Sequence, residues 1–133
     1  MLLLILTGGL RIIEVQRADI QDIQQIKGQW IIYIQGKGHD EKDAYIKIID
    51  EVKTALDDYL QTRQPYKNNY PLFTSTSNRA LNERITETSI SRLIKNIFRQ
   101  CGYNSNKLTA HSLRHTSNTL LFKSGADLYK VQQ

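Results

Sequence analysis

The order of apolar and polar residues predicts a chain built mainly from helices. The first six residues are all apolar and are followed by a break at Gly8-Gly9. This pattern indicates an apolar helix that is truncated at its N-terminus. Residues 10–17 follow as a short helix with one apolar side. Residues 51–63 again place apolar positions at helical spacing, and we expect Asp50 to cap that helix.

The most regular apolar spacing predicts a helix that begins at Thr86 or Thr88 and stops at Gly102. Its apolar positions recur every three or four residues, namely Ile90, Leu93, Ile94, Ile97 and Phe98. We expect one more helix over residues 111–124 and the start of another that Asp127 caps.

Between these helices the pattern changes to that of strands. Residues 30–35 are β-branched and aromatic, and residues 44–48 alternate polar with apolar positions. The glycine-rich stretch GKGHDEKD between them is typical of a hairpin turn. A third strand is expected over residues 20–26. The fold class is therefore α+β, mainly α-helical with a small three-stranded antiparallel β-sheet, in one domain over residues 1–133.

Charge narrows the possible partners. The formal net charge is +5, and residues 51–133 carry twelve Lys and Arg against six Asp and Glu. Such a basic segment favours a polyanion, above all nucleic acid, although a solvated basic surface has the same composition. The single cysteine, Cys101, cannot form an internal disulfide and fits a reducing compartment. The apolar start is too short to span a bilayer, so no membrane association is expected.

The first candidate for chemistry is Arg11, which follows the glycine pair at the start of a helix, with Glu14 one turn later. Helix N-termini favour anions, and an arginine there can hold a phosphate by two bonds. The alternative is an ordinary surface pair between the two residues. Apolar neighbours on both sides predict that Arg11 is at least partly buried.

The second candidate is Lys37, which lies between Gly36 and Gly38 in the hairpin turn. The two glycines leave little bulk around the ammonium, so a ligand could approach it closely. Taken alone, however, the stretch fits a flexible exposed turn with a solvated lysine better.

The third candidate is the stretch HSLRH, in which His111 and Arg114 share one helical face. Together they could clamp one phosphodiester through hydrogen bonds. His115 is four residues from His111, so the two histidines could instead hold a metal ion. No third ligand is evident and Arg114 would oppose a cation, so we expect His115 to be a packed helix residue and no metal or cofactor to be needed.

Taken together and in this order, these stretches resemble the catalytic domain of the tyrosine recombinase, or phage integrase, family. TGGLRIIEV resembles the first arginine motif of that family, and GKGHDEKDAYIKI resembles its catalytic-lysine hairpin. LTAHSLRHTSNTLLFKSGADLYKVQQ resembles its His-x-x-Arg-His box and the turn and helix that follow. The resemblance covers nearly the whole chain.

The resemblance implies a role for each candidate. Arg11 and Arg114 would bind the scissile phosphate, and His111 would help to hold it and assist proton transfer. Lys37 would protonate the leaving 5′-oxygen, and Glu14 would support the Arg11 site without touching DNA. Fixed cations stabilise the more highly charged pentacoordinate phosphorus of the transition state, and a placed proton donor speeds departure of the basic alkoxide.

Two departures from the family pattern stand out. In the first motif either Gly9 replaces the usual Thr or one glycine of Gly8-Gly9 is inserted, and an insertion would alter the turn that orients Arg11. Ile13 also occupies a position where the family often has a small residue. The family's nucleophile, a tyrosine well after the His-x-x-Arg box, has no counterpart. Only Tyr129 follows the box, and it matches a position before the missing motif. Most of the tyrosines are expected in the core or sheet, and those before the box are Tyr33, Tyr45, Tyr59, Tyr66, Tyr70 and Tyr103.

The sequence thus predicts a partial integrase catalytic domain without the N-terminal core-binding domain and the C-terminal nucleophile segment. The parent protein would perform site-specific DNA recombination as a synaptic homo-multimer on double-stranded DNA, in the cytoplasm of a prokaryotic cell, at the nucleoid when bound to DNA. The 133 residues alone would be monomeric, bind DNA weakly and form no covalent bond with it. The alternatives are a non-catalytic DNA-binding or regulatory relative and a metal-dependent nuclease.

Overall fold

The structure, a computed structural model, describes residues 1–123. It confirms the predicted class, with helices around one antiparallel sheet of three strands. None of the helices in this part of the chain combines the length and the apolar character needed to cross a membrane. In chain order the elements are α1 (Leu2–Gly8), α2 (Ile12–Arg17), the 3-10 helix η1 (Ile20–Asp22), β1 (Ile23–Ile26), β2 (Gln29–Ile34), β3 (Ala44–Lys47), α3 (Asp50–Gln61), α4 (Glu87–Gln100) and α5 (Ala110–Lys123).

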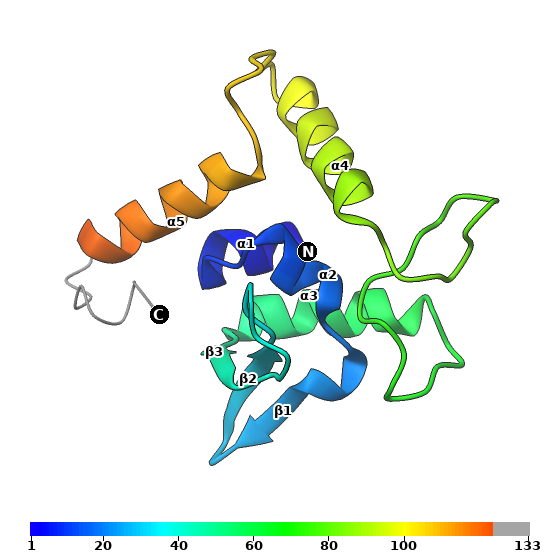
Figure 1. Ribbon diagram of the computed structural model, residues 1–133. Helices are drawn as coiled ribbons and strands as arrows, with labels where there is room; N and C mark the ends of the chain where they lie inside the picture. The colour runs from blue at the N-terminus through cyan, green and yellow to red at the C-terminus, as the bar shows by residue number, and fades with distance from the viewer. Residues whose placement is uncertain (124–133) are drawn as a thin grey trace.

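The two short N-terminal helices lie at the centre of the molecule (Figure 1). The sheet and α3 lie on one side of them, and α4 and α5 lie on the other. α1 packs against α5, while α2 packs against both α4 and β2. Because residues 9–11 connect α1 to α2, the first arginine motif is held between the sheet and the last two helices.

The sheet is a meander with β2 in the middle, and its register puts isoleucines in one row. Ile32 on β2 faces Ile23 on β1 and Ile46 on β3, and its side chain is completely buried. On the opposite face Tyr33 lies across from Tyr45, with the two rings edge to face and their centroids 6.0 Å apart. A slip of one residue would exchange these two faces, so packing of the isoleucine row against the core fixes the register.

One hydrophobic core joins the sheet to the helices. It fills the space between α1, α3, α4 and the inner face of the sheet, and burial of this apolar surface is the main favourable contribution to folding. Its most buried side chains are Leu4, Ile5, Val15, Ile32, Ile48, Val52, Leu72, Ile90 and Ile94.

Two predicted helix starts are wrong. The second helix begins at Ile12 and not at Leu10, because Arg11 has an extended backbone (φ −76°, ψ 156°) and takes the N-cap position. Asp50 does not cap α3, since Ile49 is the N-cap and Asp50 is the first helical residue. Its carboxylate still lies at the end of the helix where negative charge is favourable.

The predicted strand over residues 20–26 is correct only in its second half. The first three residues form η1, and β1 begins at Ile23. The cause is local: the Asp22 carboxylate accepts a hydrogen bond from the backbone N–H of Asp19 at 2.6 Å, which closes a tight turn before the strand can start.

The structure decides which threonine begins the long helix. Thr86 is the N-cap of α4, and its Oγ1 accepts a hydrogen bond from the Ser89 backbone N–H at 3.1 Å. Gly102 follows the end of α4 with φ 86°, as expected of a C-terminal stop. The helix predicted over residues 111–124 begins one residue earlier than expected, at Ala110. The end predicted for it at residue 124, and the helix expected after Asp127, lie outside the described residues.

Each glycine of the Gly8-Gly9 pair has its own structural reason. Gly9 ends α1 in the left-handed conformation, with φ 62°, and a Cβ there would lie 3.2 Å from Oδ1 of Asn118 on α5. A Cβ on Gly8 would collide with Cδ1 of Ile46 on β3. The pair therefore lets the turn before Arg11 pass closely between α5 and the sheet.

Replacing Gly9 by alanine should destabilise the fold more than the same change at Gly28. Both residues have positive φ, so each variant loses about 1–2 kcal/mol of unfolding free energy through backbone strain. Nothing lies within 4 Å of a Cβ at Gly28, whereas Gly9 faces α5. Urea unfolding should therefore show a larger loss for Gly9→Ala, and equal losses would contradict the close packing of this turn.

Candidate functional site

Arg11 is placed by the turn between the first two helices. Leu10 is 2% exposed and fixes the turn in the core, and Arg11 then caps α2. Glu14, three residues later, accepts a hydrogen bond from the Arg11 backbone N–H at 2.7 Å and another from its guanidinium at 3.0 Å. This one carboxylate satisfies a free backbone donor and fixes the arginine side chain at once.

Arg11 is partly buried, as expected, but far less so than its partner Glu14. Its side chain is 47% exposed, whereas the Glu14 side chain is only 5% exposed. The buried charge is thus the acidic one, and the guanidinium bonded to it faces outward. An arginine held from behind in this way keeps donors available for a ligand, because one carboxylate cannot occupy all five N–H groups.

His111 and Arg114 come from the first turns of α5, and a serine hydroxyl determines where this helix begins. The Ser112 Oγ accepts a hydrogen bond from the Thr109 backbone N–H at 3.1 Å and donates one to the Lys107 carbonyl at 3.1 Å. The hydroxyl therefore ties the preceding loop to the first helical turn. His111 is exposed there and Arg114 is half-buried.

The three basic side chains line one cleft of about 220 Å³, which lies between α2, the start of α4 and the start of α5. Its walls combine apolar with charged and polar side chains, and Ile13, the unusual residue of the first motif, forms part of them. The complete lining is Leu10, Arg11, Ile12, Ile13, Glu87, Ala110, His111 and Arg114.

The charge in this cleft is imperfectly compensated. Burial lowers the pKa of Arg114, the nearby positive charge of Arg11 lowers it further, and the negative charge of Glu14 opposes both effects. Two guanidiniums therefore repel each other in a partly desolvated place, and the charge of the buried Glu14 carboxylate, which is bonded to Arg11, offsets part of this repulsion. An anion between them relieves this repulsion, and a phosphate oxygen suits the planar donor geometry of arginine.

Glu87 is a cleft residue that the sequence analysis missed. It is the first residue of α4 and is exposed at the edge of the cleft. The only signal in the sequence was its place directly after the Thr86 cap, which indicates a helix start and nothing about the distant arginines. Its negative charge opposes an anion in the cleft.

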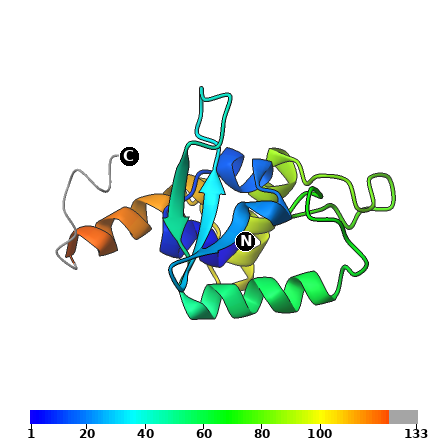
Figure 2. The same ribbon diagram turned by 90° about the horizontal axis from the view of Figure 1, so that it is seen from below.

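Lys37 is not among the residues that line the cleft. It lies in the loop between β2 and β3, where the flanking Gly38 has φ 84° and the lysine side chain is exposed. Seen from below, this loop projects from the molecule on the side opposite α3 (Figure 2). The structure thus brings Arg11, His111 and Arg114 together and leaves Lys37 on the separate β2–β3 loop, residues 35–43, which we call the lysine arm.

No tyrosine within residues 1–123 lines the cleft. Tyr33 and Tyr45 face each other on the sheet, and Tyr59 packs against Phe73 with ring centroids 5.6 Å apart. These three lie on the sheet or in the core as predicted, although Tyr45 is exposed there, whereas Tyr70 and Tyr103 are exposed outside the strands. Tyr129 lies outside the described residues.

His115 is exposed on α5, which contradicts its expected packed position. In the described part of the chain no three His, Cys, Asp or Glu side chains are grouped as metal ligands would be. The pairing of His111 with His115 therefore gains no third ligand from these residues.

Comparison with known proteins agrees with the predicted family. The model of the phage integrase family matches residues 1–133, which is the whole chain. The chain belongs to this family. Tyrosine recombinase XerD of Staphylococcus epidermidis is 34% identical to it over 137 aligned positions, which include all of this chain and 43% of XerD. The chain thus spans less than half the length of this relative.

Solved structures of the integrase family share the fold. The crystal structure of XerA recombinase superposes with a TM-score of 0.78 and 29% identity, over 97% of this chain and 44% of XerA. XerH site-specific recombinase bound to its difH substrate, in a pre-cleavage complex, gives a TM-score of 0.75 and 27% identity, over 98% of this chain and 36% of XerH. The predicted family and fold class are therefore confirmed.

Removing the charge of Glu14 should destabilise this integrase-family fold. Glu14→Gln keeps the shape of the side chain but leaves two guanidiniums without their buried counter-charge, and we expect a loss of about 1–3 kcal/mol of unfolding free energy. Glu51→Gln is the matched control, since Glu51 also lies in the first helical turn but is exposed. Thermal or urea unfolding that showed equal small losses would contradict the role of Glu14 as a buried counter-charge.

Proposed function

We propose that this chain forms the phosphate-binding part of a tyrosine-type site-specific recombinase, which cleaves and rejoins DNA strands through a 3′-phosphotyrosine intermediate. The observation that carries the proposal is the cleft in which Arg11 and Arg114 approach each other with Glu14 behind them. A site with two arginines around one small space suits a single phosphate. Membership of the integrase family supports the same conclusion.

In this proposal Arg11 and Arg114 bind the non-bridging oxygens of the scissile phosphate. Negative charge on these oxygens increases as the phosphorus becomes pentacoordinate, so fixed guanidiniums stabilise the transition state more than the ground state. His111, at the edge of the same cleft, donates a further hydrogen bond and assists proton transfer. Glu14 keeps Arg11 in place from the protein side.

Lys37 is the proposed general acid. The bond from phosphorus to the 5′-oxygen breaks, and the ammonium supplies a proton to that oxygen, which would otherwise leave as a strongly basic alkoxide. An arm that projects beyond the fold is a reasonable place for such a donor, because bound DNA itself would lie beside the arm.

The nucleophile is proposed to be a tyrosine that is not among these 133 residues, since no described tyrosine lines the cleft and Tyr129 matches a position before the family's nucleophile motif. The 133 residues alone should therefore bind DNA without forming a covalent bond. Transfer of labelled DNA onto the purified chain would refute this part of the proposal.

The proposed partner is double-stranded DNA, on which the complete recombinase assembles as a synaptic homo-multimer, whereas the isolated chain is monomeric. The structure of XerH in complex with its difH substrate supports DNA as the ligand. The proposed place of action is the cytoplasm of a prokaryotic cell, at the nucleoid.

Two variants with opposite expected effects on DNA affinity test whether a DNA phosphate occupies the cleft. Arg114→Ala removes a cation, so it should weaken binding of a DNA duplex and reduce the slope of log K against log salt by about one unit. Glu87→Gln removes the opposing charge at the edge and should strengthen binding. Fluorescence anisotropy at several salt concentrations measures both. Unchanged affinity in the two variants would place the DNA elsewhere.

The same arginine distinguishes recombinase activity from simple DNA binding. In the complete protein, Arg114→Ala should abolish covalent attachment to DNA and leave much of the binding, because its largest contribution is to the transition state. If the unaltered complete protein bound DNA but never became attached to it, a non-catalytic DNA-binding relative would be the better description.

A further inference from the structure

A second group of charges, apart from the phosphate cleft, lies at the base of the β2–β3 loop. Lys42, near the end of this loop, donates a hydrogen bond to the Asp19 carboxylate at 2.7 Å and another to the Asp22 carboxylate. The side chains of Lys42, Asp19 and Asp22 are only 23%, 17% and 7% exposed. Ion pairs this far from solvent are less screened than surface pairs, so they restrain the loop more strongly.

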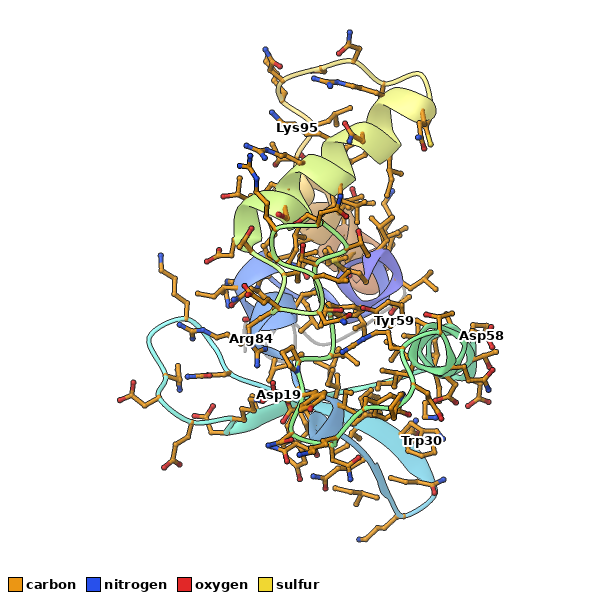
Figure 3. All side chains as sticks on the ribbon, turned by 90° about the vertical axis from the view of Figure 1, so that its right-hand side faces the viewer. Asp19, Trp30, Asp58, Tyr59, Arg84 and Lys95 are labelled. Carbon is orange, nitrogen blue, oxygen red and sulfur yellow. The ribbon has the colours of Figure 1, made fainter. Side chains whose placement is uncertain are left out.

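The acidic half of this group is itself fixed to the body of the protein. Arg84 forms an ion pair with Asp19 and also donates hydrogen bonds to the carbonyls of Gln16 and Ala18, at 2.9 and 3.2 Å. Figure 3 shows Asp19 and Arg84 next to each other, on the side of the fold from which the loop projects. Burial alone would raise the pKa of Asp19, but the hydrogen bonds from Lys42 and Arg84 hold it below its usual value.

The part of the loop that follows β2 is also fixed, in this case by a contact with α2. Arg17, the last residue of α2, donates a hydrogen bond to the Gly36 carbonyl at 3.2 Å, directly before Lys37. Within the loop, the Gln35 side chain donates a hydrogen bond to the His39 carbonyl at 2.9 Å. Lys37 therefore lies between two restrained points, Gly36 and Lys42, while its own side chain is exposed.

These contacts connect the lysine arm to the phosphate cleft through a single short helix. The start of α2 holds Arg11 through Glu14, and its end holds the β2–β3 loop through Arg17 and the segment with Asp19. A proton donor must lie within hydrogen-bond distance of the leaving oxygen, so an arm that moves freely would lose much of its effect.

We propose that Lys42 is a positioning residue for the reaction, and that its ion pairs with Asp19 and Asp22 hold the β2–β3 loop so that Lys37 can protonate the leaving 5′-oxygen. This inference rests on the proposed function, in which Lys37 is the general acid. Lys42 acts through Lys37 and touches neither DNA nor the reacting atoms, because two carboxylates of the protein hold its ammonium.

The test compares two leaving groups in single-turnover cleavage by the complete protein. In an ordinary DNA substrate the bond from phosphorus to oxygen breaks, and the 5′-oxygen needs a proton. In a substrate with a bridging 5′-sulfur the bond from phosphorus to sulfur breaks, and the thiolate leaves without a proton because a thiol is far more acidic than an alcohol. A defect in proton delivery therefore disappears with the sulfur substrate.

Lys42→Met should slow cleavage of the ordinary substrate on the order of tenfold or more, as part of the ~10²–10⁴-fold that general acid catalysis contributes. With the sulfur substrate its rate should return close to that of the unaltered protein. Lys42→Arg should cleave both substrates nearly normally, since arginine can also bind both carboxylates. Lys47→Met, the same charge change at an exposed position of β3, is the matched control and should have little effect.

Two results would overturn the inference: normal cleavage of the ordinary substrate by Lys42→Met, or equal slowing with both substrates. Failure of the proposed function gives a different result, because Lys37→Ala would then be equally slow with both substrates or the unaltered protein would cleave neither. Thermal unfolding shows whether Lys42→Met folds. If it does not, Lys42→Gln, which can still donate to one carboxylate, takes its place and should show an intermediate slowing restored by sulfur.

Discussion

The bond between the buried Glu14 carboxylate and Arg11 is the interaction on which the rest of the site depends. It starts α2, because the carboxylate accepts the free N–H at the cap, and it fixes the guanidinium from the protein side. It also supplies negative charge that partly offsets the repulsion between Arg11 and Arg114. A buried charge without a partner is costly, so the pair stabilises the phosphate site and the fold together.

The site unites residues that are about one hundred positions apart, and glycine makes their approach possible. Gly8 lies against β3 and Gly9 lies against α5, so the turn before Arg11 fits where a Cβ would be obstructed. Packing of α1 against α5 then brings His111 and Arg114 to the same cleft as Arg11. The lysine arm is fixed separately, by ion pairs of Lys42 at the far end of α2.

The helices and the sheet could be predicted from the sequence because apolar spacing and turn residues are local signals, and the arginine motifs were found through their resemblance to those of the integrase family. The features that could be found only in the structure are mostly contacts between residues far apart in the sequence or between charged side chains. Arg11 has apolar neighbours but is exposed, since the carboxylate behind it takes the buried place. Glu87 reaches the cleft only through the packing of α4 against α2. The pairing of Lys42 with Asp19 spans 23 positions, and no spacing rule indicates it.

The central claim is that Arg11 and Arg114 hold one phosphate between them. Nuclear magnetic resonance of the arginine Nε–H groups, recorded while dimethyl phosphate is added to the chain, tests it most directly. We expect the signals of both arginines to shift along one binding curve with a common dissociation constant, because one anion contacts both. Separate curves, or a shift of only one of the two signals, would show that the guanidiniums bind anions independently and would contradict a shared phosphate site.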